Sequence, residues 1–333
     1  MPNPQGIWSF IQQQSTQGLK VILLQVLESQ GSSPGRQGFR MAVDETGQMH
    51  GSIGGGIMEH KFVEMAKVRL LEEVEERSVH RQIHDKTAPK NQSGMICSGE
   101  QTVLLYTIQE NDREAIDNVI EAVSNRQPGT IRLSPNGIDF DKDEFSEMFS
   151  YSFQSENEWL YREKIGFQNN LFIVGGGHCA LAFSKVMAMM DFHIHLFEDR
   201  ENLNTVQQNA FVHEKTIVSS YEEIHDLIPA DPSSYVVVMT FGYRSDDLVV
   251  RSLRGKEFGF FGVLGSKKKI EKMWADYRAE GFDEKWLKSI SAPVGIPIKS
   301  QTPEEIAISI AAEIIQVKNR QLSGTTRSSE KCC

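Results

Sequence analysis

The second half of the chain alternates short apolar runs of strand length with segments of helix length. The first run, Leu171–Val174, leads into the glycine turn Gly175–Gly177 and then into the apolar-rich segment His178–Met190, which is long enough for about three helical turns. A second run, His193–Phe197, ends at the acidic pair Glu198–Asp199. This order predicts a unit of strand, glycine turn, helix, strand and acid.

The same alternation continues beyond this unit and predicts a doubly wound parallel sheet. Further strands are expected at Thr216–Val218, Tyr235–Thr240 and Gly259–Leu264, and helices at Tyr221–Leu227, Asp246–Arg254, Lys267–Glu280 and Pro303–Val317. The last helix begins with a capping box, Thr302 and Glu305, around an N-terminal proline. Because such sheets bind ligands at the carboxyl ends of their strands, the loops there should converge on one crevice.

The first half is richer in strands. They are expected at Lys20–Leu27, Phe39–Val43, Met49–Ile53, Val79–Ile83 and Gln101–Ile108, with helices at Ile7–Gln14, Ile57–Glu76 and Asn111–Asn125 and a small hairpin at Thr130–Leu133 and Gly137–Phe140. The polar, acidic stretch 141–158 is expected to be a connector.

These patterns predict an α/β fold class, with a C-terminal doubly wound Rossmann-like parallel sheet and a smaller N-terminal α+β domain. The expected divisions are an N-terminal domain over 1–110, a connector with a helix and a small hairpin over 111–167, the Rossmann-like domain over 168–320, and a disordered tail over 321–333.

Composition narrows the classes of partner and compartment. The formal net charge of −10 argues against nucleic acid or an anionic membrane as the main partner. No apolar run approaches the roughly 18–20 residues of a membrane span, and the N-terminus does not have the pattern of a signal peptide. The four cysteines do not form a disulfide framework. We therefore expect a cytoplasmic protein.

The glycine turn of the second half fits the dinucleotide-binding pattern G-x-G-x-x-A. Gly175 permits a tight turn, Gly177 lets a phosphate approach the backbone, and Ala180 lets the helix pack closely on the strand. The helix N-terminus offers N–H groups and a partial positive charge, and Glu198 or Asp199 can accept hydrogen bonds from a ribose. The alternative is an ordinary βαβ unit that binds no ligand.

A second glycine-rich loop, Gly51–Gly56, also runs into a predicted helix. Its backbone could hold an anion or a flat ligand, or it could be a tight turn that binds nothing. Glu59 suits the first turn of that helix and could be purely structural. Cys97 lies in a glycine-flanked, turn-prone segment, where it could be a soft ligand or nucleophile, or a small buried apolar residue.

Several polar residues admit two interpretations. His178 could contact a bound phosphate or face solvent. His193 and His195 alternate along a strand and so face one side, but no third ligand lies near them in the sequence, and the pair alone does not predict a metal site. The run Lys267–Lys269 could balance ligand phosphates or be a solvated surface.

Taken together, these motifs resemble the XdhC/CoxI family, accessory proteins of xanthine dehydrogenase and related molybdenum hydroxylases. The resemblance covers nearly the whole chain. It rests on Gly31-Ser-Ser-Pro34, Gly51-Ser-Ile-Gly-Gly-Gly56 with Glu59, Gly94-Met-Ile-Cys97, Gly175-Gly-Gly-His-Cys-Ala180, Asp199-Arg200, Leu264-Gly-Ser-Lys-Lys268, Ala292-Pro-Val-Gly-Ile296, Thr302-Pro-Glu-Glu-Ile-Ala-Ile-Ser-Ile310 and Ala312-Glu-Ile-Ile315.

The resemblance implies a chaperone-like protein that binds molybdenum cofactor (molybdopterin), assists its sulfuration and inserts it into an apo xanthine dehydrogenase or related molybdenum hydroxylase. A cysteine desulfurase is a candidate further partner, and a homodimer is expected. Cys97 becomes the candidate metal contact, and the Rossmann-like half could hold part of the cofactor or a separate NAD(P). The cofactor-binding residues implied are Ser33, Arg36, Ser52, Gly54, Gly55, Gly56, Glu59, Cys97, Gly175, Gly176, Gly177, His178, Ala180, Glu198, Asp199, Arg200, Thr240, Asp246, Gly265 and Ser266.

The chain departs from the family pattern in the loop after the fourth predicted strand of the second half. The family commonly has T-H-x-H-x-x-D there, whereas this chain has Thr240-Phe-Gly-Tyr-Arg-Ser-Asp246. Phe241 and Tyr243 cannot act as imidazole acid, base or ligand. Two alternatives therefore stay open: an NAD(P)-dependent oxidoreductase, for which Tyr243 is the only evident acid or base, and a nucleotide-binding regulatory module.

Overall fold

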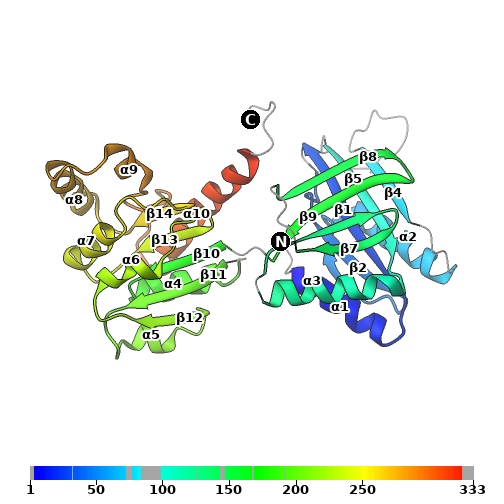
Figure 1. The fold of residues 1–333 in the computed structure, drawn as a ribbon, viewed down its shortest axis with the longest axis horizontal. Helices are drawn as coiled ribbons and strands as arrows, with labels where there is room; N and C mark the ends of the chain where they lie inside the picture. Colours follow the sequence, from blue (N-terminus) through cyan, green and yellow to red (C-terminus); the bar gives the residue numbers. More distant parts are fainter. Residues whose placement is uncertain are drawn as a thin grey trace. The chain divides into compact units, whose positions relative to one another are not determined.

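The computed structural model describes residues 4–31, 33–72, 77–83, 99–125, 127–142, 147–166, 169–190 and 192–324. The chain divides into two compact units, Met1–Phe167 and Gln168–Cys333 (Figure 1). Among the described residues, no helix combines the length and apolar composition needed to cross a membrane.

The first sheet of unit 1 has five antiparallel strands in the order β3-β2-β1-β5-β4. The strands are β1 (Val21–Gly31), β2 (Arg40–Asp44), β3 (Met49–Ser52), β4 (Ser78–Ile83) and β5 (Gly99–Thr107). The apolar start of β1 is fully buried, which suits its central place in the sheet. The five strands predicted in this half are confirmed, with shifts of a few residues at their ends.

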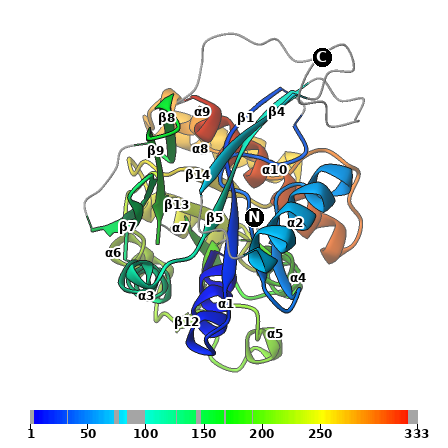
Figure 2. The ribbon, with the colours of Figure 1, turned by 90° about the vertical axis from the view of Figure 1, so that its right-hand side faces the viewer.

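The two faces of this sheet are covered differently. One face packs against α2 (Gly56–Leu71), and the other packs against α1 (Pro4–Thr16) and α3 (Arg113–Ser124). A short 3₁₀ turn, η1 (Glu110–Asp112), leads into α3. Figure 2 shows α2 on one side of β1 and β5, with α1 and α3 together on the other.

The face of α2 that packs on the sheet uses only some of the helix's apolar residues. Its buried row is Met58, Phe62, Ala66 and Leu70, at spacings of four residues, with Val63 beside it. Other apolar residues lie off this row: Met65 is partly buried, and Ile57, Val68 and Leu71 are exposed. The helix has more apolar residues than one face can bury, which explains their imperfect periodicity.

Unit 1 contains a second, four-stranded sheet that the sequence reasoning missed in part. Its order is β7-β6-β9-β8, formed by β6 (Gly129–Ser134), β7 (Gly137–Asp141), β8 (Phe149–Ser155) and β9 (Glu158–Ile165). The hairpin β6–β7 is confirmed, but the prediction of a connector over 141–158 was wrong, because β8 lies within it. β8 is a partly exposed edge strand, and its alternating Phe149, Tyr151 and Phe153 are the signal that the sequence reasoning missed.

Unit 2 is built on a parallel sheet in the order β12-β11-β10-β13-β14. The strands are β10 (Asn169–Val174), β11 (Phe192–Glu198), β12 (Glu214–Ile217), β13 (Ser234–Val238) and β14 (Phe260–Val263). The predicted Rossmann-like α/β class is confirmed. β10 is the first strand of unit 2, β11 and β12 follow on one side of it, and β13 and β14 lie on the other. The topological switch point therefore lies between β10 and β13.

Helices cover both faces of the parallel sheet (Figure 1). On one face lie α4 (His178–Met187), α5 (Asn204–Gln208) and α10 (Pro303–Gly324); on the other lie η2 (Tyr221–Glu223), α6 (Ile224–Leu227), α7 (Tyr243–Ser252), α8 (Lys267–Ala279) and α9 (Glu284–Ser289). The short helices α5 and α9 were not predicted.

The ends of α10 test two expectations. The capping box is confirmed, since Glu305 N–H donates to Thr302 Oγ1 at 3.2 Å and Thr302 N–H donates to Glu305 Oε2 at 3.3 Å. At its other end the helix continues to Gly324, into the segment 321–333 that was expected to be disordered. The remainder of that segment lies outside the described residues.

Candidate functional site

The glycine turn after β10 lies at the switch point of the parallel sheet. Gly175 has φ +108°, and a Cβ on it would lie 2.5 Å from the carbonyl oxygen of Met239, which follows β13. Its backbone N–H donates to Phe197 O at 2.8 Å. The turn is therefore in direct contact with the ends of both neighbouring strands, and only glycine fits at its first position.

Glu198, the first acid after β11, is fully buried and closes this turn. Its Oε2 accepts the backbone N–H of Gly176 at 2.6 Å, and its Oε1 accepts Arg200 Nε at 2.6 Å. Burial alone would raise the pKa of the Glu198 carboxyl, but the hydrogen bonds from Arg200, Asp199 and Gly176 outweigh it and lower that pKa. Glu198 is thus an ionised structural group, and its oxygens face the protein.

Asp199 occupies a different environment, although it adjoins Glu198. Its side chain is 37% exposed, and one of its oxygens accepts the Tyr221 hydroxyl at 3.2 Å. Partial burial, together with the neighbouring Glu198 carboxylate, raises the pKa of Asp199. Of the two acids that could meet a ribose, Asp199 is the one that reaches solvent.

Arg200 brings a positive charge to the same rim. Its guanidinium lies 5.5 Å from the ring centre of Phe241, which is 88% exposed in the loop after β13. A guanidinium can pair with a phosphate, and an exposed aromatic ring can stack on a flat heterocycle. These two groups suit a phosphorylated ligand that also carries a ring.

The N-terminus of α4 faces open space. Gly177 is its N-cap, with φ −70°, and no side chain in the described part of unit 2 caps the helix there. A Cβ on Gly177 would meet nothing within 4 Å, and His178 is exposed. A helix N-terminus offers N–H donors and a partial positive charge, so an anion could approach here.

The loop after β13 is held from within by Asp246. This buried carboxylate accepts the Thr240 hydroxyl at 2.5 Å and the Thr240 N–H at 3.1 Å, and it pairs with Lys269 of α8. Through these bonds Thr240 and Asp246 fasten β13 to α8, and their expected contact with a cofactor stays a prediction. One lysine of the run 267–269 is thereby used internally.

Two further residues expected in the crevice have local roles at the start of α8. Ser266 is the N-cap of this helix, and its hydroxyl accepts the Lys269 N–H at 3.3 Å. A Cβ on Gly265 would lie 3.0 Å from the Lys269 side chain. Both positions therefore shape the turn that follows β14.

Tyr243, the residue singled out from the sequence as a possible acid or base for hydride transfer, is held by a partner on α8. Its hydroxyl donates to Asp276 Oδ2 at 2.7 Å. Burial and the Asp276 carboxylate raise the pKa of Tyr243 to about 12. A phenol with a raised pKa and an engaged proton is a weak general acid at neutral pH.

The glycine-rich loop of unit 1 is organised by Glu59 of α2. Glu59 Oε2 accepts the Ser52 hydroxyl at 2.7 Å, the Ile53 N–H at 2.9 Å and the Gly55 N–H at 3.0 Å. A carboxylate of the chain itself therefore takes the place that an external anion could occupy. This favours the structural interpretation of Glu59.

This loop contacts two other segments of unit 1, the one that carries Ser33 and the start of β5. Ser33 donates to Gln101 Oε1 at 2.8 Å, and Gln101 Nε2 donates to Ile53 O at 3.0 Å. A Cβ on Gly54 would lie 2.4 Å from the Gly35 nitrogen, so the two loops are in contact. The exposed Arg36 donates to Gly31 O at 3.0 Å.

Cys97 lies outside the described residues, and its role as a metal contact stays a prediction. The chain is described again from Gly99, which pairs with Gly31 at the end of β1. The start of β5 thus adjoins the segment that carries Ser33 and Arg36.

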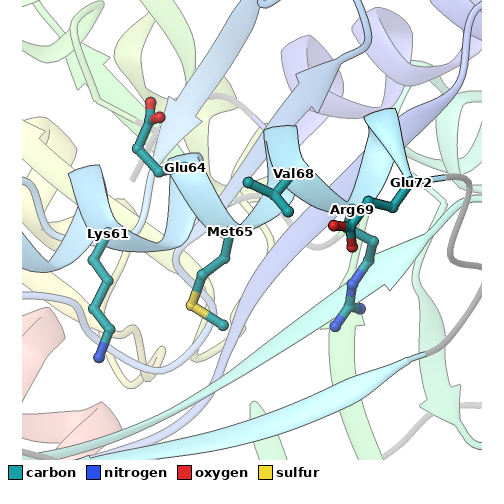
Figure 3. Close-up of a pocket in the computed structure, with 6 residues that line it drawn as sticks. All are labelled: Lys61, Glu64, Met65, Val68, Arg69 and Glu72. Atoms are coloured by element: carbon teal, nitrogen blue, oxygen red, sulfur yellow. The ribbon is translucent and has the colours of Figure 1, made fainter.

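The exposed side of α2 carries a separate groove of about 520 Å³ (Figure 3). None of the residues expected to bind a cofactor lines it. Its lining mixes apolar and charged groups from one side of the helix: Lys61, Glu64, Met65, Val68, Arg69 and Glu72.

The structure also brings together a group of possible metal ligands that the sequence did not predict. His193 and His195 of β11 lie with Glu214, the first residue of β12. The sequence did not reveal this group, because Glu214 is known to lie beside His195 only when β12 is known to pair with β11.

Comparison with known proteins agrees with this architecture. Residues 171–314 match the model of the XdhC Rossmann domain, and residues 15–81 match the model of the XdhC and CoxI family. A solved structure described as a xanthine dehydrogenase from Bacillus halodurans shares the fold, with a TM-score of 0.73 and 21% sequence identity over 94% of this chain and 96% of that one.

Two curated relatives are longer than this chain. An uncharacterised Escherichia coli protein, YqeB, is 25% identical over 305 residues, which cover 91% of this chain and 44% of YqeB. A Bacillus subtilis protein named as a probable subunit of xanthine dehydrogenase is 30% identical over 89 residues, 27% of this chain and 25% of that protein. The matches therefore span less than half the length of either relative.

Proposed function

Since the chain belongs to the XdhC and CoxI family, we propose that it is an accessory protein of a xanthine-dehydrogenase-type hydroxylase and that it binds molybdenum cofactor. We place the cofactor's phosphate at the N-terminus of α4, at the switch point between β10 and β13. The observation that carries this placement is the open space at Gly177, beside the exposed end of a helix with no side-chain cap among the described residues.

The groups around this position have complementary roles. Backbone N–H groups at the start of α4 would hold the phosphate, and the Arg200 guanidinium would balance its charge. Phe241 would stack on the ring system, and Asp199 would accept hydrogen bonds from ligand hydroxyl or amine groups. The bound cofactor would supply the molybdenum centre that the hydroxylase uses in catalysis, while the chain binds and orients the cofactor.

The loop of unit 1 is a poorer candidate for the phosphate. Ile53 and Gly55 already donate to the Glu59 carboxylate, which would repel a second anion. Contact between Cys97 and the metal stays part of the proposal. Family membership alone suggests assistance in sulfuration, delivery to the apo-hydroxylase and a cysteine desulfurase as second partner. A homodimer also stays a prediction.

The alternative of an NAD(P)-dependent oxidoreductase has less support. It needs an acid or base near the nicotinamide, and Tyr243 has its proton engaged by Asp276 and a raised pKa. The same crevice could nevertheless hold a nucleotide without chemistry, so NAD(H) belongs in the binding test.

The test is equilibrium binding of molybdenum cofactor and NAD(H), titrated separately into the wild type, Gly177→Ala and His178→Ala. Gly177→Ala adds a methyl group to the open space and should weaken binding by at least about tenfold. His178→Ala keeps the backbone donors and should change affinity by no more than roughly threefold. Thermal unfolding should show that both variants remain folded.

Either of two outcomes would contradict the proposal. If Gly177→Ala bound the cofactor as tightly as the wild type does, the phosphate would not bind at the N-terminus of α4. Tight binding of NAD(H) with no binding of molybdenum cofactor would make the chain a nucleotide-binding protein. A parallel titration of Cys97→Ala tests whether the thiol adds to cofactor affinity.

A further inference from the structure

The cluster of His193, His195 and Glu214 lies away from the proposed cofactor crevice. His193 and His195 are in the first half of β11, and Glu214 is the first residue of β12. The crevice is built at the carboxyl ends of the same strands, beyond Glu198. The cluster is therefore separate from the crevice and lies toward the amino ends of these strands.

Strand geometry places the three side chains on one face. Residues two apart on a strand point to the same side, which aligns His193 with His195. β12 runs parallel to β11, and its register sets Glu214 directly beside His195. The two imidazoles and the carboxylate are thus brought together by regular secondary structure, which is a firmer support than a loop.

The distances suit a shared ion. Glu214 Oε1 is 2.9 Å from His193 Nε2, Glu214 Oε2 is 3.2 Å from His195 Nδ1, and one ligand atom from each residue lies within 4.8 Å of the others. Tetrahedral zinc with bonds of about 2.0–2.2 Å separates its ligand atoms by roughly 3.3 Å. Small side-chain rotations would satisfy that geometry.

Neighbouring rings fix the two imidazoles. Phe172 of β10 stacks on His195, with ring centres 4.9 Å apart. The His213 ring lies 4.5 Å from the His193 ring, and His213 Nδ1 accepts the Ile194 N–H at 3.0 Å. The side chains of His193, His195 and Glu214 are 2%, 18% and 53% exposed, so the nitrogen ligands are shielded while the carboxylate side is open to solvent.

We propose that His193, His195 and Glu214 form a binding site for one divalent transition-metal ion, with zinc as the best fit. Two imidazoles and one carboxylate favour zinc, cobalt, nickel or copper over magnesium or calcium, which prefer all-oxygen sites. Three protein ligands leave a fourth position for water on the exposed side. Metal binding replaces the two histidine–carboxylate hydrogen bonds, and each imidazole offers its lone pair in place of its N–H.

The test uses the full chain with its cysteines alkylated by iodoacetamide, so that thiols cannot bind the metal. Co²⁺ is titrated first, because four-coordinate cobalt absorbs visible light, and Zn²⁺ is then added as competitor. We expect one Co²⁺ per chain, displacement by Zn²⁺, and a higher melting temperature with either ion. None of these readouts involves molybdenum cofactor.

Matched variants locate the ion. His195→Gln and Glu214→Gln should each weaken Co²⁺ binding by at least about tenfold, a typical loss for a disturbed metal site. His225→Ala, which removes an exposed histidine of α6, should bind as the wild type does. No Co²⁺ bound by the alkylated wild type, or equal binding by all three variants, would overturn the proposal and leave a hydrogen-bonded cluster only.

Discussion

Gly176 donates its backbone N–H to the Glu198 carboxylate at 2.6 Å, across the glycine turn of the parallel sheet. The first acid after β11 therefore stabilises the turn from inside. This leaves the outer acid, Asp199, to face a ligand, beside the partly exposed Arg200, whose guanidinium also donates to Glu198. The two adjacent carboxylates therefore differ in environment: Glu198 is buried and stabilises the turn, whereas Asp199 is the one that a ligand could reach. Because the turn depends on ionised Glu198, its stability should depend on pH.

Replacing Glu198 by Gln should lower stability and flatten its dependence on pH. The folded-state pKa of Glu198 lies below its ordinary value of 4.5, so ionised Glu198 contributes stability above about pH 4.5 and loses it as the pH falls toward the folded value. We expect Glu198→Gln to lose about 2 kcal/mol at pH 7. Urea unfolding at several pH values between about 7 and 3 measures both effects.

Asp199→Asn is the matched control for that experiment. The pKa of Asp199 is raised above its ordinary value of 3.8, so its ionisation opposes folding as the pH rises through the folded pKa. The variant should be as stable as the wild type at pH 7, or slightly more so. If Glu198→Gln showed the same pH profile as Asp199→Asn, the assignment of the two roles would be wrong.

The glycines of the turn should differ in their tolerance of alanine. Gly175→Ala puts an alanine at a positive φ and places its methyl group 2.5 Å from Met239 O. We therefore expect the free energy of unfolding to fall by more than about 2 kcal/mol. Gly177→Ala has an ordinary φ and open space, and it should unfold like the wild type. Equal stability of the two variants in urea would contradict this account of the turn.

The order of strands and helices in unit 2 could be predicted because each buried strand is a short apolar run. The sequence could not say which acid is functional, since Glu198 and Asp199 differ only in environment. It also could not bring Glu214 to His193 and His195, because their adjacency depends on the register between β11 and β12.

Unit 1 was harder to predict for related reasons. The edge strand β8 does alternate aromatic and polar residues, with Phe149, Tyr151 and Phe153 at every second position, but the polar and acidic residues around it led to the prediction of a connector. On α2, apolar residues on both sides of the helix obscured the row that packs on the sheet. The glycine loop was recognised, but the hydrogen bonds from Ser52, Ile53 and Gly55 to Glu59 follow from three-dimensional proximity alone.

A buried ion pair between the two sheets of unit 1 should be strongly coupled. Arg40 of β2 pairs with Glu163 of β9, their side chains are 4% and 8% exposed, and Glu163 also accepts the Tyr161 hydroxyl at 2.7 Å. Arg40→Met or Glu163→Met leaves one buried charge and should cost about 3–5 kcal/mol. The double variant should lose less than the sum of the single losses, which a double-mutant cycle in urea would show. Additive losses would mean that the pair does not interact energetically.

Removing the Glu59 carboxylate should turn the glycine loop of unit 1 into an anion site. In Glu59→Ala the Ile53 and Gly55 N–H groups lose their acceptor, and we expect a loss of about 1–3 kcal/mol. Inorganic phosphate can then replace the carboxylate, so it should raise the melting temperature of the variant by more than that of the wild type, in which phosphate has only the proposed site at α4. Glu59→Gln, which keeps an acceptor oxygen, should be less destabilised and should respond to phosphate as the wild type does. If phosphate stabilised the wild type and Glu59→Ala equally, the anion would bind elsewhere. If Gly177→Ala then abolished that common effect, the phosphate would be located at α4, where we place the cofactor.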